Sequence, residues 1–253
     1  MAPDETGTPP TKAQQIADEL KAAIERGDYG PGGRLPGENA LAEQYDVASL
    51  TARRALKILR TEGLIETKKG AGARVISFDP IRRRGLQRLA QGHWGSGKSV
   101  WAADDSRIPD VDQITVTEGV LPPRHISSVL ELPPSETVCV RSRRYLMAGR
   151  PVMIAESYLP QSLVTGFPIT QADTGPGGVY ARLRDLGHAP ARFREEVRVR
   201  MPTAEEVTRL AIPTERSVIK LARTAFDSEG RAVEINEMTM DSAAYVLDYE
   251  FDA

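Results

Sequence analysis

Two adjacent arginines, Arg53 and Arg54, stand near the start of a helix that the sequence predicts over residues 48–61. The planar guanidinium of Arg53 can donate two parallel hydrogen bonds to O6 and N7 of a guanine, a pairing that reads sequence in the major groove. Arg54 and the hydroxyl of Thr51 can bind phosphates, which position a protein on a duplex without reading it. These residue types on one short helix predict recognition of double-stranded DNA.

The other candidate DNA contacts lie on both sides of this helix in the sequence. A glycine-bounded turn carries Lys68 and Lys69, whose amines can reach phosphate or the minor groove. The predicted DNA-binding residues are Arg34, Ser49, Leu50, Thr51, Arg53, Arg54, Lys68, Lys69 and Gly70. A solvated charged helix would explain any one arginine, but it does not explain two helices, a short turn and a basic ribbon together.

Polar residues alternate along three predicted strands of the second half, so each group shares one face of its strand. The groups are Arg141, Arg143 and Tyr145, then Glu156 and Tyr158, then Glu234 and Asn236. Guanidinium groups opposite carboxylates and a phenol can form a pocket for a small effector, and two arginines favour a carboxylate or phosphate on that effector. The alternative is that these residues line the solvent face of an antiparallel sheet, where charges are ordinary.

The segment Gly92–Ser99 reads GHWGSGKS and matches the phosphate-loop pattern G-x-x-x-x-G-K-[ST] at every position. In nucleotide-binding proteins that loop follows a buried strand and opens a helix. Here a basic stretch with helical spacing precedes it, and Asp104, Asp105 and Pro109 soon follow. We therefore expect a linker that carries the pattern by coincidence. A nucleotide-binding enzyme is the alternative, and loss of ATP binding on Lys98→Ala would support it.

Charge is distributed unevenly along the chain. From Arg53 to Arg88 eleven lysines and arginines stand against three acidic residues, although the whole chain of 253 residues has a formal net charge of −2. Because local charge decides nucleic-acid binding, the overall balance does not exclude it.

Neither a cofactor nor a metal ion is expected. Cys139 is the only cysteine, which excludes an internal disulfide and a cysteine zinc site. The three histidines lie far apart, and no nucleophile elbow occurs, so we do not expect an enzyme. No apolar run approaches the length of a membrane span and no apolar signal core stands at the N-terminus, so we expect a cytoplasmic protein.

Hydrophobic spacing predicts three helices and a small ribbon in the first third of the chain. The helices span residues 12–26, 37–44 and 48–61, and the ribbon pairs residues 64–67 with residues 73–76. The second half alternates strands with short helices, which is typical of an α+β domain on a mostly antiparallel sheet. The expected organisation is a disordered tail over 1–10, a DNA-binding domain over 11–77, a linker over 78–110, and an effector-binding and dimerisation domain over 111–253.

The sequence resembles the GntR family of bacterial transcription regulators. The matching segments are QIADELKAAIERGDYGPGGRLPGENALAEQYDV, TARRAL, LRTEGLI and the glycine-containing wing. Further segments resemble the HutC subfamily, whose effector domain, called UTRA, has a chorismate-lyase-like fold: RSRRYLMAGRPVMIAESYLP, VYARLRDLGHAP, PTAEEVTRLAIP and GRAVEINEMTMDSAAYVLDYEF. The resemblance implies a winged helix-turn-helix joined to a UTRA domain, in a homodimeric, ligand-responsive repressor on a pseudo-palindromic operator.

The chain departs from the family pattern near the reading helix. Ala48-Ser49 stands where the family usually has Ser-Arg, Ala52 where it has valine, and Gly37 where it has serine. The missing arginine removes a usual base or phosphate contact, so the operator sequence is expected to differ while the fold stays the same. A repressor of the same fold whose C-terminal domain only dimerises, as in plasmid- or phage-type regulators, is the further alternative.

Overall fold

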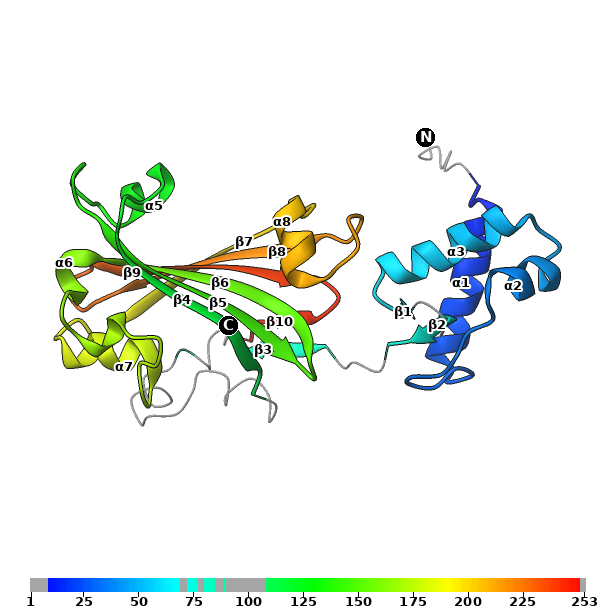
Figure 1. The fold of residues 1–253 in the computed structure, drawn as a ribbon, viewed down its shortest axis with the longest axis horizontal. Helices are drawn as coiled ribbons and strands as arrows, with labels where there is room; N and C mark the ends of the chain where they lie inside the picture. Colours follow the sequence, from blue (N-terminus) through cyan, green and yellow to red (C-terminus); the bar gives the residue numbers. More distant parts are fainter. Residues whose placement is uncertain (1–8, 69–71, 77–79, 85–88, 90–107, 251–253) are drawn as a thin grey trace, which may run out of the picture. The chain divides into compact units, whose positions relative to one another are not determined.

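The computed structural model describes residues 9–68, 72–76, 80–84, 89 and 108–250. The chain divides into two compact units, Met1–Asp79 and Pro80–Ala253 (Figure 1), each of which is described by itself. Lys69, Gly70, the phosphate-loop-like segment Gly92–Ser99 and most of the expected linker lie outside the described residues.

Three helices and a two-stranded wing make up the first unit. They are α1 (Lys12–Glu25), α2 (Glu38–Gln44), α3 (Ser49–Thr61), β1 (Ile65–Lys68) and β2 (Gly72–Val75). The strands pair antiparallel from Ile65 opposite Val75 to Lys68 opposite Gly72. The predicted helix-turn-helix and wing are therefore confirmed within one or two residues at each end.

Each helix of this unit buries one stripe of small and aliphatic side chains. The common core contains Ile16 and Leu20 of α1, Leu41 of α2, and Ala55 and Leu59 of α3. Asp46 adopts a left-handed backbone conformation, with φ of 48°, in the turn between α2 and α3. Aspartate tolerates this conformation better than most residues, so the chain can turn sharply and set α3 across α2.

A six-stranded antiparallel sheet forms the second unit, in the order β4-β5-β6-β9-β8-β7. The strands are β4 (Asp110–Val120), β5 (Val138–Met147), β6 (Arg150–Pro160), β7 (Arg192–Arg200), β8 (Val218–Phe226) and β9 (Ala232–Asp241). The helices are α5 (Arg124–Val129), α6 (Gln161–Val164), α7 (Gly178–Asp185) and α8 (Ala204–Leu210), with a 3-10 turn, η3 (Pro168–Thr170). The predicted α+β class and antiparallel sheet are confirmed.

The two faces of the sheet have different coverings. One face, called here the cavity face, packs Cys139, Leu159 and Ala225 against α6, η3 and α7. The opposite face carries α5 at one end, through Ile126, and α8 at the other, through Leu210. The middle of that opposite face lies between these two short helices.

Residues 81–84, which we expected within the linker, form a strand of the second unit. This strand, β3 (Ile81–Arg84), pairs parallel with β10 (Tyr245–Asp248). Its burial alternates, with Ile81 and Arg83 buried. A run of three arginines gives no apolar signal for a strand, and the structure shows why one forms: Arg83 has buried partners, which are described below.

Candidate functional site

The exposed face of α3 carries most of the predicted DNA contacts. Ala52, Ala55, Leu56 and Leu59 are buried on the opposite side of the helix. Ser49, Leu50, Arg53 and Arg54 are exposed, and Leu50 keeps 55% of its surface accessible. Positions three and four apart share a helix face, so these side chains form one surface at the start of α3.

Arg53 is held by an acid from the neighbouring helix. Its Nε lies 3.1 Å from Oε1 and 3.0 Å from Oε2 of Glu38, in the first turn of α2. The pair is exposed, so it contributes little to the free energy of unfolding. Because Glu38 takes only the Nε hydrogen, both terminal nitrogens of Arg53 stay available for a guanine edge. Glu38 was not among the predicted residues.

We expect Glu38→Gln to change the choice of DNA more than the strength of binding. Loss of the carboxylate frees the Arg53 side chain to sample more rotamers and removes a negative charge near the phosphates. Operator affinity should fall by less than about tenfold, an estimate based on the modest value of an exposed ion pair, while affinity for random duplex rises slightly. Fluorescence anisotropy with both duplexes measures the ratio of operator affinity to random-duplex affinity. If this ratio is the same in Glu38→Gln as in the unaltered chain, Glu38 does not orient Arg53.

Thr51 and Arg54 lie along a groove between α1 and α3. Lys12 and Lys57 line the same groove, which gives it three basic side chains. Glu62, the acid at this groove, is engaged by Lys21 at 2.9 Å. The groove therefore suits phosphate oxygens rather than base edges.

The remaining predicted contacts belong to the wing. The Arg34 guanidinium lies against Gly72 of β2, with its Nε 3.5 Å from the place a Cβ would occupy. The backbone of Arg34 forms an isolated antiparallel β-bridge with Arg74 of β2, so Arg34 lies beside the wing. Lys68 ends β1 opposite Gly72.

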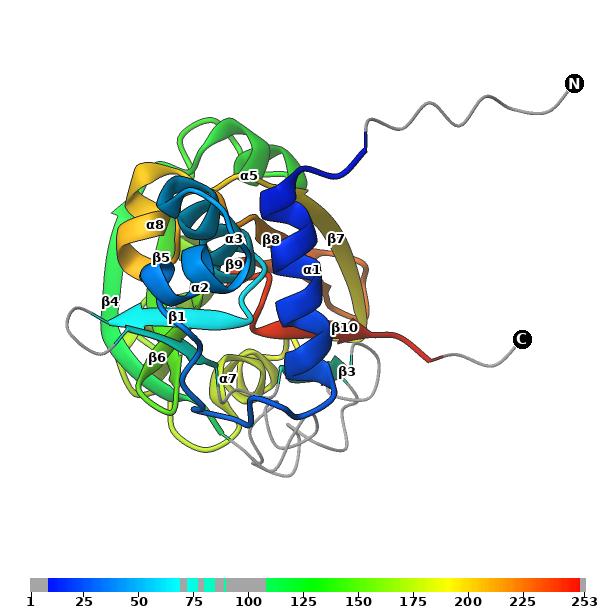
Figure 2. The ribbon, with the colours of Figure 1, turned by 90° about the vertical axis from the view of Figure 1, so that its right-hand side faces the viewer.

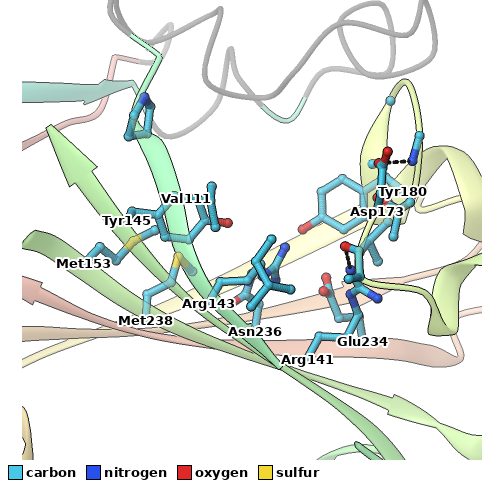
Figure 3. Close-up of a pocket in the computed structure, with 18 of the residues that line it drawn as sticks. Val111, Arg141, Arg143, Tyr145, Met153, Asp173, Tyr180, Glu234, Asn236 and Met238 are labelled. Carbon is cyan, nitrogen blue, oxygen red and sulfur yellow. Dashed lines mark hydrogen bonds between the residues drawn. The ribbon is translucent and has the colours of Figure 1, made fainter. Parts of the chain in front are cut away.

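A cavity of about 760 Å³ opens on the cavity face of the sheet. Five of the seven predicted effector residues line it: Arg141, Arg143, Tyr145, Glu234 and Asn236. Figure 3 shows an apolar end, with Val111, Tyr145, Met153 and Met238, and a polar end, with Arg141, Tyr180 and Glu234. Arg143 and Asn236 lie between the two ends. The cavity therefore suits a small molecule with one apolar and one polar part.

Arg141 supports the wall of this cavity. Its guanidinium donates to the carbonyl oxygens of Ile169 at 2.6 Å, Ala172 at 3.0 Å, and Gln171. Only 2% of Arg141 is exposed. Because these three bonds use most of its donors, Arg141 fixes the loop after η3 and contributes positive potential to the cavity.

Several polar atoms at the cavity have no hydrogen-bond partner among the described residues. Three are donors, namely Nε of Arg141, Nε of Arg143 and Nη2 of Arg223, and two are acceptors, Oε2 of Glu234 and Oδ1 of Asn236. Arg143 does use another nitrogen, which donates to Oγ of Ser157 at 2.6 Å. Buried polar groups are nearly always paired, so unpaired atoms of both kinds favour a ligand that accepts at one point and donates at another.

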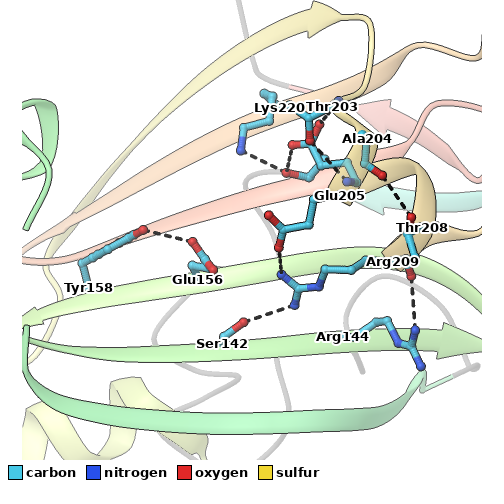
Figure 4. A network of polar contacts seen from close by, with 12 residues as sticks. Ser142, Arg144, Glu156, Tyr158, Thr203, Ala204, Glu205, Thr208, Arg209 and Lys220 are labelled. Carbon is cyan, nitrogen blue, oxygen red and sulfur yellow. Dashed lines mark hydrogen bonds and ion pairs between the residues drawn. The ribbon is translucent and has the colours of Figure 1, made fainter. Parts of the chain in front are cut away.

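Glu156 and Tyr158 do not line the cavity, and the reason is a β-bulge. Met147 pairs with Arg150 at the hairpin, but Tyr145 pairs with Met153, so the register shifts by one residue. Without this shift Glu156 would stand opposite Arg141, on the cavity face. A slip of one residue turns every following side chain to the other face, where Tyr158 donates to Glu156 at 3.0 Å (Figure 4).

Three contributors to the cavity were not among the predicted residues. They are Tyr180 on α7, Arg223 on β8 and the loop Asp173–Gly178. Arg223 alternates with Leu221 and Ala225 on an otherwise apolar face of its strand, and the glycines of TGPGG mark a tight loop. Both signals are visible in the sequence, but neither points to a cavity until the sheet order is known.

Arg223 connects the cavity to the strand that opens the second unit. Its Nε donates to Glu195 Oε1 at 2.8 Å, and Arg83 Nη2 of β3 donates to the same oxygen at 2.6 Å. Tyr249 donates to the other Glu195 oxygen at 3.0 Å. Burial opposes ionisation of Glu195, but the two arginines outweigh it and hold the pKa of its carboxyl below the usual range. Glu195 is thus a mostly buried anion, with 11% of its side chain accessible, that a cavity residue and β3 share.

Tyr180 places a neutral hydroxyl group at this end of the cavity. Burial and the neighbouring Glu234 raise the pKa of Tyr180 to about 12. Nη1 of Arg223 lies 3.4 Å from its hydroxyl oxygen.

Two family models match the chain. "Bacterial regulatory proteins, gntR family" matches residues 12–75, and the UTRA domain matches residues 112–246. None of the helices among the described residues is long and apolar enough to cross a membrane.

The similar proteins are transcription regulators. An uncharacterised HTH-type transcriptional regulator of Streptomyces coelicolor is 29% identical, over 95% of this chain and 92% of its own. The HTH-type transcriptional repressor NagR of Bacillus subtilis is 28% identical, over 87% and 86%. The crystal structure of PhnF from Mycobacterium smegmatis matches with a TM-score of 0.57 at 21% identity, over 94% of this chain and 99% of that one, which shows a shared fold.

Proposed function

The chain belongs to the GntR family of bacterial transcription regulators, in the HutC subfamily with a C-terminal UTRA domain, and on that premise we propose that it is a cytoplasmic repressor released from its operator by a small-molecule effector. Its function is DNA-binding regulation rather than enzymatic catalysis. The proposed effector site is the cavity on the sheet, and the proposed reading head is the start of α3.

The unpaired polar atoms of the cavity are the observation that carries the effector proposal. Arg143 and Arg223 offer donors with positive charge, while Glu234 and Asn236 offer acceptors. A ligand with an anionic group and a hydroxyl or ammonium group would satisfy both kinds. Charge-assisted hydrogen bonds of this sort are stronger than neutral ones, so such a ligand offsets the desolvation cost of these buried, unpaired atoms.

The exposed residues of α3 support the reading head. Arg53 presents two terminal nitrogens, and Leu50 offers an apolar surface that suits a thymine methyl group. A homodimer would place two such heads on the half-sites of a pseudo-palindromic operator. The repressor NagR, at 28% identity, supports repression over activation.

Glu195 provides the route by which the cavity can influence the head. An anionic ligand that binds Arg223 competes with Glu195 for the same guanidinium, which weakens the hold of Glu195 on Arg83. Arg83 lies on β3, only seven residues after Ile76, which follows the last strand of the wing in the sequence. We infer that β3 has two arrangements and that the effector shifts the equilibrium between them. The size of this change in equilibrium is set by the difference in effector affinity between the two arrangements.

A ligand screen tests this proposal. We expect some sugar phosphates or small carboxylic acids to raise the melting temperature of the full chain and, at the same concentrations, to lower its affinity for operator DNA. Arg143→Ala should remove the ligand-induced shift, because it deletes a donor that faces the cavity.

Arg144→Ala is the matched control for this screen. Arg144 is the next residue on β5 but lies on the opposite face, where it binds Asp112 at 2.5 Å. The ligand should raise the melting temperature of the Arg144→Ala variant by as much as it raises that of the unaltered chain. A ligand that stabilises the chain without weakening operator binding would contradict release by the effector, and absence of any stabilising ligand would favour a domain that only dimerises.

A further inference from the structure

The two edges of the six-stranded sheet differ in how open they are to another strand. Figure 2 shows β4 and β7 at opposite margins of the sheet. The β4 edge is irregular, with register shifts between Asp112 and Thr115 and between Thr117 and Val120. The β7 edge pairs with β8 without a shift from Arg192 to Arg200. Irregular edges resist pairing, whereas a long regular edge invites it.

The second half of β7 is exposed on both faces. All five residues from Glu196 to Arg200 are exposed, and Val197 and Val199 keep 43% and 66% of their surface accessible. Glu196 and Arg198 make no hydrogen bond or ion pair with any residue that the structure describes. Two apolar side chains and two unpaired charges of opposite sign thus lie on one open edge.

We propose that β7 pairs with β7 of a second copy of this chain, antiparallel and about a two-fold axis at Val197, to join the two sheets. This proposal rests on the homodimer of the proposed function but not on its effector or its operator. An interface of this kind uses the same surface of both subunits, and the backbone groups of each edge satisfy those of the other.

The charges select this register. In an antiparallel pair about a two-fold axis, the residue on the axis faces its own copy, and its neighbours exchange partners. An axis at Glu195, Glu196 or Arg198 would set two like charges directly opposite, which destabilises a strand pair. An axis at Val197 sets valine against valine and places Glu196 opposite the partner's Arg198, twice by symmetry.

The ends of the paired segment are also compatible. Arg194 would stand opposite the partner's Arg200, but each of these side chains is already engaged within its own subunit. Arg200 binds Glu206 through two contacts of 2.7 Å, and the Arg194 guanidinium lies 5.6 Å from the ring centroid of Phe226. On the cavity face Met201, with 54% of its surface accessible, would meet the partner's Phe193.

Charge reversal on the full chain tests the pairing by sedimentation equilibrium. Glu196→Arg and Arg198→Glu should each weaken the dimer by about tenfold or more, because each places like charges opposite at two symmetric sites. The double variant Glu196→Arg/Arg198→Glu should return to the dissociation constant of the unaltered chain, since it restores both pairs with their signs exchanged. Restoration separates a defined register from general damage to the fold.

Arg194→Glu is the control on the same strand and face. In the proposed register it should leave the dimer as strong or make it stronger, whereas an axis at Glu195 would pair Arg194 with the partner's Glu196 and predict weakening. A monomeric unaltered chain, single variants that dimerise as tightly as it does, or a double variant that stays weak would each overturn the proposal. If one of these results is found and the unaltered chain still binds its operator, the proposed DNA recognition is retained and only the β7 pairing is wrong.

Discussion

Arg53→Ala is expected to weaken operator binding by roughly 1–3 kcal/mol and to relax the preference for one base pair in each half-site. The guanidinium of Arg53 is exposed, lies at the start of α3 and has two terminal nitrogens beyond the contact with Glu38. A bidentate contact with guanine discriminates between bases, so its loss should affect the correct operator far more than random duplex.

The measurement is anisotropy titration with the operator and with duplexes altered one position at a time. Lys57→Ala serves as the control, because Lys57 lines the groove that suits phosphates. That variant should lower affinity for all duplexes alike and reduce the dependence on salt. Equal losses on operator and random duplex in the Arg53 variant would place Arg53 among the phosphate contacts instead.

Arg83→Met is expected to disconnect effector binding from operator release. The substitution removes the β3 end of the buried Glu195 network but leaves Glu195 bound to Arg223 and Tyr249. Effector affinity should therefore change little. Allosteric coupling, measured here as the factor by which saturating effector lowers operator affinity, is typically about 5–150-fold. We expect this factor to fall below about threefold in the Arg83→Met variant.

The readout compares operator affinity with and without saturating effector. Arg82→Met is the matched control, since Arg82 is the exposed neighbour on β3 and makes an exposed contact of 3.7 Å with Asp248. It should retain full coupling. Normal release by the Arg83 variant would show that Glu195 is a structural counter-charge and that the signal travels by another route.

The sequence was most informative where local patterns determine the structure. Apolar and β-branched residues mark β7 and β8 in the sequence, and Thr203 followed by Glu206 is a capping-box pattern at the start of α8. The structure forms this box: Glu206 N–H donates to Thr203 Oγ1 at 3.2 Å and Thr203 N–H donates to Glu206 Oε2 at 2.8 Å. Alternation, helix caps and turn residues are short-range signals, so one chain suffices to read them.

The candidate site was less predictable because it depends on contacts far apart in the chain. The faces of Arg141, Arg143 and Tyr145 follow from alternation alone, and these residues do line the cavity. The bulge near Tyr145 that turns Glu156 away has no clear signal in the sequence.

Long-range pairing also explains why β3 was missed. Its strand partner is β10, near the other end of the chain, and Arg83 is buried only because Glu195 provides a counter-charge. A buried arginine is unfavourable without such a partner, so the sequence around Arg83 taken by itself favours an exposed segment.

Selection of bound duplexes from a random DNA pool tests the central claim most directly, namely that paired α3 helices read two half-sites. The unaltered chain should enrich an inverted repeat with half-site centres about one helical turn, roughly 10 base pairs, apart. The Arg53→Ala chain should lose one base preference in each half. Failure to enrich any sequence at low ionic strength, or enrichment of a single motif without a repeat, would contradict the account.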